Sequence, residues 1–453
     1  MGRAEQGKGF RQNGWRRSGH LAGLAAAVFG ILAVLAPGVS ASSTAPPVPP
    51  NEDPFYSYSG SLSGLAPGAV LGERVIQLVL FPDLATPVSA FQLLFRTTSE
   101  LGKPALGVAT VIRPLLGPVL PRVLSWQPFY DSLGPQCDPS YDLRGGVTPT
   151  LGSAYFSSCD MEGQAEATGA ATFLAQGATV VVTDYEETNQ AWAAGPLEGY
   201  ATLDGIRAAE SYLHYSEATT PVAMIGYSGG AIATQWAAEL APAYAPHLDV
   251  VAAAAGGVLV DPIHNLHYIN GGGTGWSYVI PATMLSIFDR AFGIDVYQYA
   301  SAYGAELMNE DQDAFINDLA KGNITYQELL QPQYANFTSI PDIVPDLNAL
   351  IMGSNGTPKA SMLLENGEGT TDNGYDGDGI MIASDVEALA HEYCQRGVSV
   401  EYLQADGDNH TEASVPFIAV AIPYLSGRLA GLPGLSNCSM IGTGSSLAPL
   451  PSS

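Results

Sequence analysis

The nine residues Val222–Gly230 constrain the fold of this chain more than any other stretch. They read V-A-M-I-G-Y-S-G-G, and the helix-like run Ala231–Ala241 follows at once. This is the G-x-S-x-G pattern in the order strand, sharp turn and helix, which is typical of a nucleophilic serine held on a strained turn. The pattern predicts that Ser228 is the nucleophile. The turn would also direct the backbone N–H of Gly229 toward a developing oxyanion. The alternative is a glycine turn that opens a helix with Ser228 as its N-cap.

Segments with strand character alternate with segments of helix character around this turn. The expected strands are Val70–Phe81, Phe91–Thr97, Gly107–Ile112, Val123–Trp126, Ala178–Thr183, Leu248–Ala255, Met362–Glu365 and Val398–Leu403. The expected helices are Met161–Gln176, Leu203–Leu213 and Ala383–Arg396. Because strands that alternate with helices favour right-handed crossovers, the sequence predicts an α/β fold with a mainly parallel central sheet.

The stretch Asp261–Ser354 interrupts this alternation. It carries many aromatic residues, and its segments Ala282–Phe292 and Asp311–Leu319 have apolar residues at helical spacing. The strand and helix rhythm resumes at Met362–Leu364, so we expect residues 261–354 to be a helical cap or lid inserted into a core of residues 42–260 and 355–453. A separate domain is the alternative. The aromatic residues would pack a core or form an apolar wall for a substrate tail.

Residues 1–41 have the composition of a secretory signal peptide. Basic residues come first, the apolar run Leu21–Ala36 follows, and Val39-Ser40-Ala41 resembles a cleavage site. The apolar run is short for a membrane span, so we expect a secreted chain with no transmembrane segment after cleavage. An uncleaved anchor is the alternative.

The charge of the chain excludes one class of partner. The chain has 17 Lys and Arg against 44 Asp and Glu, a net charge of −27. Removing residues 1–41 takes away five basic residues and one acidic residue, which leaves a net charge of −31. Such a surface repels nucleic acid and anionic headgroups, so no nucleic-acid partner is expected.

The four cysteines indicate two disulfides, because an exported chain meets an oxidising compartment. Three pairings are possible. Pairing within each half, Cys137–Cys159 and Cys394–Cys438, is the simplest. There is no Cys-x-x-Cys spacing that would suggest a metal site, and we expect neither a metal nor a cofactor.

A serine nucleophile needs a histidine base and a carboxylate that orients it. Of seven histidines, His410 lies in the loop after the last expected strand, where an α/β-hydrolase order places the base. The carboxylate should come from the loop Asn366–Ile380, and Asp378 is the first candidate because it shortly precedes the apolar run that starts at Ile380. Asp376 is the second candidate. The same acidic loop could bind calcium, but its spacing fails the EF-hand pattern.

Six stretches together resemble the secretory lipase family typified by Candida antarctica lipase A. They are Phe129–Ser132 with Cys137–Tyr141, Thr183–Glu186, Leu203–Ala208, Gly226–Gly230, Asp378–Ile380 and Asn409–Glu412. The resemblance spans roughly residues 67–438 and implies an α/β-hydrolase with a helical cap and no metal. It also implies a triad of Ser228, Asp378 and His410, oxyanion donors at Gly229 and Asp131, and a Cys394–Cys438 disulfide. Asp131 could instead be a turn residue. Glu187, where the family more often has glycine, is a departure from the pattern.

Together these observations predict a secreted, serine-dependent carboxylic-ester hydrolase that acts on a lipid or other ester, most simply a triacylglycerol lipase. An acyltransferase and a short-chain esterase would use the same triad. A catalytically silent α/β-hydrolase that only binds ligands is the alternative of a different class.

Overall fold

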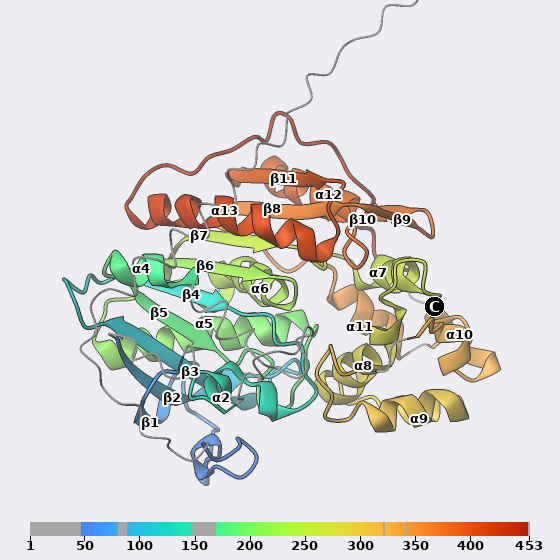
Figure 1. Ribbon diagram of the computed structural model, residues 1–453, viewed down its shortest axis with the longest axis horizontal. Coiled ribbons are helices and arrows are strands. Elements are labelled where there is room, and N and C mark those ends of the chain that lie inside the picture. Colours follow the sequence, from blue (N-terminus) through green and yellow to red (C-terminus); the bar gives the residue numbers. More distant parts are fainter. Residues whose placement is uncertain (1–46, 80–87, 147–168, 320–321, 341, 452–453) are drawn as a thin grey trace, which may run out of the picture. The chain divides into compact units, whose positions relative to one another are not determined.

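The computed structural model describes residues 47–79, 88–146, 169–319, 322–340 and 342–451 (Figure 1). The expected signal peptide, the first half of the expected helix Met161–Gln176 and Cys159 lie outside the described residues. The Cys137–Cys159 disulfide therefore stays a prediction.

A nine-stranded sheet forms the centre of the described chain, in the order β1-β2-β3-β5-β4-β6-β7-β8-β11. Its strands are β1 (Val70–Ile76), β2 (Val88–Thr98), β3 (Pro104–Pro114), β4 (Val123–Gln127), β5 (Thr179–Thr183), β6 (Pro221–Tyr227), β7 (Asp249–Gly256), β8 (Ser361–Glu368) and β11 (Val400–Asp406). The first three strands and β5 pair antiparallel, and all pairs from β5 to β11 are parallel. The sheet is therefore mainly parallel, as predicted.

Helices cover both faces of the sheet (Figure 1). They are α2 (Pro139–Asp142), α4 (Ala171–Ala175), α5 (Gly195–Leu213), α6 (Gly229–Tyr244), α12 (Ala383–Gln395) and α13 (His410–Leu429). Val222 and Met224 of β6 join the core that contains α5, α6 and α12, whereas Ala223 and Ile225 join the core that contains α4 and α13. The strand is apolar throughout because side chains alternate between two buried faces.

Between β7 and β8 the described residues form helices and turns and add no strand to the sheet. The helices are α7 (Pro262–Ile269), α8 (Ile280–Thr283) with a π-helical continuation over Met284–Ala291, α9 (Ala302–Glu310), α10 (Tyr326–Leu329) and α11 (Ile343–Ala349). In Figure 1 they gather beside one end of the sheet. Their apolar side chains belong to the same core cluster as α5 and α6.

The predicted helix over Asp311–Leu319 is wrong. This stretch is a series of turns, and Phe315 forms an isolated β-bridge with Ser132. Its backbone groups bond to a distant loop: Leu133 donates to the carbonyl of Ala314. The helical spacing of its apolar residues reflects burial against several elements at once.

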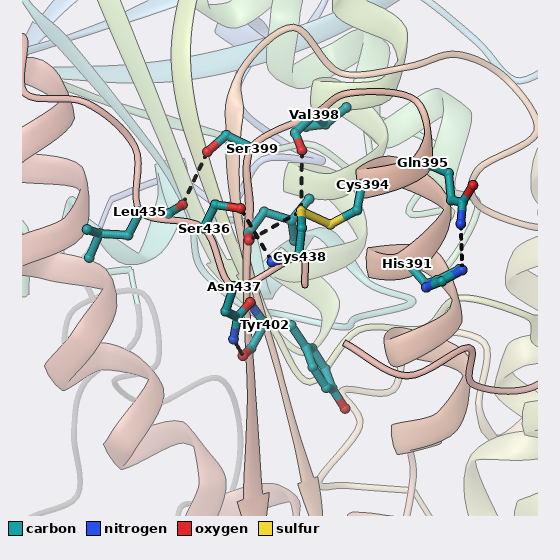
Figure 2. Close-up of a disulfide and its surroundings, with 11 residues drawn as sticks. His391, Cys394, Gln395, Val398, Ser399, Tyr402, Leu435, Ser436, Asn437 and Cys438 are labelled. Atoms are coloured by element: carbon teal, nitrogen blue, oxygen red, sulfur yellow. Dashed lines mark hydrogen bonds between the residues drawn. A yellow bond between two sulfur atoms is a disulfide. The ribbon is translucent and has the colours of Figure 1, made fainter. Parts of the chain in front are cut away.

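The predicted Cys394–Cys438 disulfide is confirmed (Figure 2). It joins the end of α12 to the tail that follows α13. The tail also runs along the edge strand β11, where Asn437 N–H donates to the Val400 carbonyl over 3.0 Å and the Asn437 side chain bonds the backbone of Tyr402. The tail therefore covers a strand edge that would otherwise present unpaired backbone groups.

In the part of the chain that the structure describes, no helix is both long and apolar enough to cross a membrane.

We predict that the double variant C394S/C438S loses up to about 4 kcal/mol of unfolding free energy, because the disulfide closes a loop with a sequence separation of 44. Urea unfolding without reductant, which leaves any other disulfide intact, measures this loss. The m-value should change little if the native fold is kept. An unchanged urea midpoint would contradict the stabilising role.

Candidate active site

Ser228 lies on the turn between β6 and α6 in a backbone conformation that is rare for a residue with a side chain (φ 54°, ψ −121°). Two glycines make this turn possible. A Cβ on Gly226 would collide with the carbonyl of Gly230, and a Cβ on Gly230 would collide with the carbonyl of Gln127 at the end of β4. The Ser228 hydroxyl makes no capping bond to α6, contrary to the N-cap alternative.

His410 begins α13 and reaches both candidate partners. Its Nε2 lies 2.8 Å from Ser228 Oγ, and its Nδ1 lies 2.7 Å from Asp378 Oδ2. Asn409 caps the helix by accepting hydrogen bonds from the N–H groups of Thr411 and Glu412, so His410 is not the N-cap residue. Its buried ring is free to link the hydroxyl to the carboxylate.

Asp378 follows the hairpin of β9 (Thr370–Asp372) and β10 (Tyr375–Gly377) and is buried. Its Oδ1 accepts from the N–H groups of Ile380 and Met381, at 2.9 and 2.7 Å, which leaves Oδ2 for His410. The Asp378 carbonyl also accepts from the His410 N–H over 2.8 Å. Asp376 is exposed on β10, where it accepts from Thr371, and it does not join this group.

Asp131, in the loop after β4, contacts Gly229, the residue that follows Ser228. Gly229 is the first residue of α6, where backbone N–H groups lack intrahelical partners. Asp131 lies in the loop after β4 with φ 23°, and its Oδ1 packs so closely on Gly229 that a Cβ there would collide with it. Burial raises the pKa of the Asp131 carboxyl to about 6, and nearby His410 partly offsets the rise.

Three more carboxyls are buried between the end of β5 and the first turn of α5. Glu186 and Glu187 follow β5, and Glu198 lies in the first turn of α5. Glu186 Oε2 accepts from the Ser132 N–H at 3.4 Å, while both carboxyl oxygens of Glu187 and of Glu198 lack a hydrogen-bond partner of good geometry among the described residues. Burial raises the pKa of all three well above the ordinary value, and Asp131 adds to the rise for Glu186 and Glu198.

Two aromatic side chains that the sequence analysis did not single out as site residues also contact the histidine. The Tyr227 hydroxyl donates to the His410 carbonyl over 2.5 Å, and the Tyr227 ring lies 5.2 Å from the imidazole. Trp276, which precedes α8, meets the imidazole edge-on at 5.9 Å. Tyr227 occupies the variable position before the serine, so only its place in the motif could have indicated it. Nothing in the local sequence distinguishes Trp276 from the other aromatic residues of 261–354.

The arrangement suits acyl transfer through a nucleophilic serine. A hydroxyl, an imidazole and a buried carboxylate lie in hydrogen-bonded series, with a helix N-terminus beside the hydroxyl. Among the residues with described coordinates, no group of three or more His, Cys, Asp or Glu side chains is arranged to hold a metal ion.

Comparison with known proteins shows what this chain is similar to. A family model described as secretory lipase matches residues 156–363. The trichothecene C-3 esterase of Fusarium sporotrichioides is 31% identical over 416 residues, which is 86% of this chain and 86% of that protein. A probable inactive lipase of Mycobacterium tuberculosis (strain CDC 1551 / Oshkosh) is 29% identical over 396 residues, covering 85% of this chain and 84% of the relative.

The structure is similar to that of Candida antarctica lipase A in its closed state. The TM-score is 0.76 at 24% sequence identity, over 88% of this chain and 91% of that one. This likeness confirms the predicted α/β-hydrolase fold class.

We predict that the protein loses stability as the pH rises above about 4.5. Burial raises the pKa of Glu198 in the folded protein, so the folded state favours the neutral acid. The stabilisation from Glu198 is therefore fully present below its unfolded-state pKa, and it is lost as the pH rises toward its folded-state pKa. Between pH 5 and pH 8, Glu198→Gln should reduce this loss of unfolding free energy, because the amide does not titrate.

Urea unfolding at both pH values measures the effect. The matched control is Glu306→Gln on α9, whose side chain is exposed. Equal pH dependence in wild type and Glu198→Gln would show that Glu198 is ionised in the folded protein.

Proposed function

Because the chain belongs to the secretory lipase family of carboxylic-ester hydrolases, we propose that Ser228, His410 and Asp378 are the catalytic triad with which it hydrolyses its esters. The resemblance seen in the sequence motifs is thereby confirmed at the level of the family. The observation that carries the proposed triad is the unbroken series from Ser228 Oγ to His410 Nε2 at 2.8 Å and from His410 Nδ1 to Asp378 Oδ2 at 2.7 Å.

In the first half of the proposed reaction Ser228 attacks the ester carbonyl while His410 Nε2 takes the hydroxyl proton. The tetrahedral oxyanion accepts hydrogen bonds from the N–H groups of Gly229 and Asp131. His410 then gives the proton to the leaving alcohol, and the acyl-enzyme remains. Asp378 fixes the imidazole tautomer of His410 and stabilises the imidazolium that forms. Two backbone N–H groups hold Asp378 Oδ1, so the carboxylate is fixed with Oδ2 toward the imidazole.

In the second half a water molecule replaces the alcohol. His410 takes a proton from the water, which attacks the acyl carbonyl, and the same N–H groups hold the second oxyanion. The collapse of this intermediate releases the carboxylic acid and returns the proton to Ser228. Neither half-reaction as written calls for a metal or a redox group.

We further propose that residues 261–354 form a cap over a core of residues 42–260 and 355–453, and that the substrate is a lipid ester such as a triacylglycerol. Two features support this. Trp276 lies against His410, and the apolar side chains of α8 and the following π-helical turn are buried beside it. Export through the signal sequence 1–41 would bring such an enzyme to substrates outside the cell.

The first test compares wild type with Ser228→Ala on nitrophenyl butyrate and nitrophenyl palmitate. The variant should lose about 10⁵-fold or more in kcat on both esters, because the triad acts as a unit. Circular dichroism and urea unfolding check that the variant is folded.

Each other outcome identifies a rival. Activity that survives in Ser228→Ala would overturn the triad, and rates that fall steadily beyond butyrate would indicate a short-chain esterase. Transfer to an added alcohol in preference to water would indicate an acyltransferase. A wild type with no activity on either ester would favour a silent, ligand-binding role.

A second test addresses the Asp131 side chain, which can donate a hydrogen bond to the oxyanion only in its acid form. Since the pKa is raised to about 6, the acid form dominates below pH 6 and is lost above it. We therefore expect the kcat of wild type to decline as the pH rises through about 6. Asp131→Asn, whose amide donates at every pH, should abolish this decline.

The pH profile of kcat measures the effect. The charged or titratable groups facing Asp131 are His410, Glu186 and Glu198, and Asp131→Asn leaves all three in place. Asp346→Asn on α11 is the matched control, because that carboxyl also has its pKa raised to about 6. An alkaline decline that persists in Asp131→Asn would limit the role of Asp131 to its backbone N–H.

A further inference from the structure

Arg290 ties three separate segments together with one guanidinium group. It lies in the last turn of the π-helical stretch after α8 and is half-buried. Its Nη1 donates to the carbonyls of Leu133, at 2.6 Å, and Gln190, at 3.2 Å, and more weakly to that of Asn189, at 3.4 Å. Its Nη2 donates to the carbonyl of Gln312 over 2.5 Å. The three segments are the loop after β4, the loop after β5 and the turns of residues 311–319.

The loop after β4 is also paired directly with those turns. Ile316 N–H donates to the Asp131 carbonyl over 3.1 Å, and Leu133 N–H donates to the Ala314 carbonyl over 2.9 Å. Between these bonds Ser132 and Phe315 form the isolated bridge. The peptide groups on both sides of Ser132 are therefore fixed by residues 314–316.

Asp131 needs such support. Its φ of 23° lies in a region that residues with a side chain seldom adopt, and such conformations persist only when the surroundings hold them. Its carboxyl is also packed on Gly229 without a partner for Oδ1 among the described residues. An oxyanion donor stabilises a transition state only when it is already fixed in place, so loosening this loop would weaken the donor.

A guanidinium is well suited to hold several carbonyl groups at once. It remains charged and presents donors in a rigid plane, whereas an ammonium is a single point on a flexible stem. Arg290 donates to the carbonyl of Leu133 in the loop after β4 and to that of Gln312 in the turns 311–319. One guanidinium therefore binds both of the segments that pair at Ser132 and Phe315.

We propose that Arg290 is a positioning residue for the oxyanion hole, which couples the seating of residues 261–354 to the conformation of Asp131. This inference rests on the proposed function and deepens it. When that segment is seated, the carbonyl groups of Leu133 and Asp131 are held and Asp131 keeps its strained backbone conformation. When the segment is displaced, the Asp131 loop loses its bonds to Arg290, Ala314 and Ile316 together.

The test is the series Arg290→Met and Arg290→Lys, with kcat expressed per site labelled by a nitrophenyl alkylphosphonate. Arg290→Met should lose about 10²-fold in kcat, the effect of losing one oxyanion donor, with KM changed less than threefold. Arg290→Lys should be intermediate because one ammonium cannot reach the carbonyls of both Leu133 and Gln312.

Affinity for a trifluoromethyl ketone separates positioning from a general structural role. This probe forms a tetrahedral adduct on the serine, so its inhibition constant should weaken by about the same factor as kcat/KM falls. The matched control is Arg396→Gln. Arg396 holds the carbonyls of Gly353 and Gly356, at 2.6 and 3.2 Å, near the other end of the same segment, and its loss should leave kcat unchanged.

The outcomes are distinguishable. Wild-type kcat and ketone affinity in Arg290→Met would overturn this inference alone, and so would a lower kcat with unchanged ketone affinity. A wild type that the phosphonate does not label at Ser228 would overturn the proposed function and this inference with it. If Arg290→Met does not fold, the graded loss of ketone affinity in Arg290→Lys carries the test, and an undiminished affinity there would overturn the inference.

Discussion

The structure depends on the close approach of three backbone segments around Ser228. Because Gly226 and Gly230 lack side chains, the turn after β6 packs against its own helix and against Gln127 at the end of β4. That approach brings the first N–H of α6 beside the loop that carries Asp131. The strained φ of Ser228 is a consequence of the same geometry, which turns the hydroxyl away from the helix and toward His410.

The parts of the site that depend on local sequence were predictable. The strand, turn and helix around Ser228 are encoded within about twenty consecutive residues, and His410 and Asp378 follow strands of a parallel sheet whose carboxyl ends meet at one edge. The choice of Asp378 over Asp376 depended on the apolar run after it. Its physical reason is that Ile380 and Met381 turn their N–H groups back onto the carboxylate.

The parts that depend on distant contacts were not predictable. Residues 311–319 have helical spacing, but their backbone bonds go to a loop about 180 residues earlier in the chain, and no local pattern records such a partner. No pattern in the local sequence singles out Arg290. The role that we propose for Arg290 depends on the convergence of the carbonyls of Leu133, Gln190 and Gln312 on its guanidinium.

The buried carboxyls lie near both the loop that carries Asp131 and the Arg290 guanidinium. Burial raises the pKa of Asp131, Glu186 and Glu198, and the Asp131 carboxyl raises that of the two glutamates further, so this corner of the site favours neutral acids. A neutral environment spares a developing oxyanion from repulsion by nearby carboxylates. The guanidinium of Arg290 also interacts electrostatically with Glu186. The same side chain donates to the carbonyl of Leu133, two residues after Asp131, so it also helps to hold this aspartate in its strained conformation.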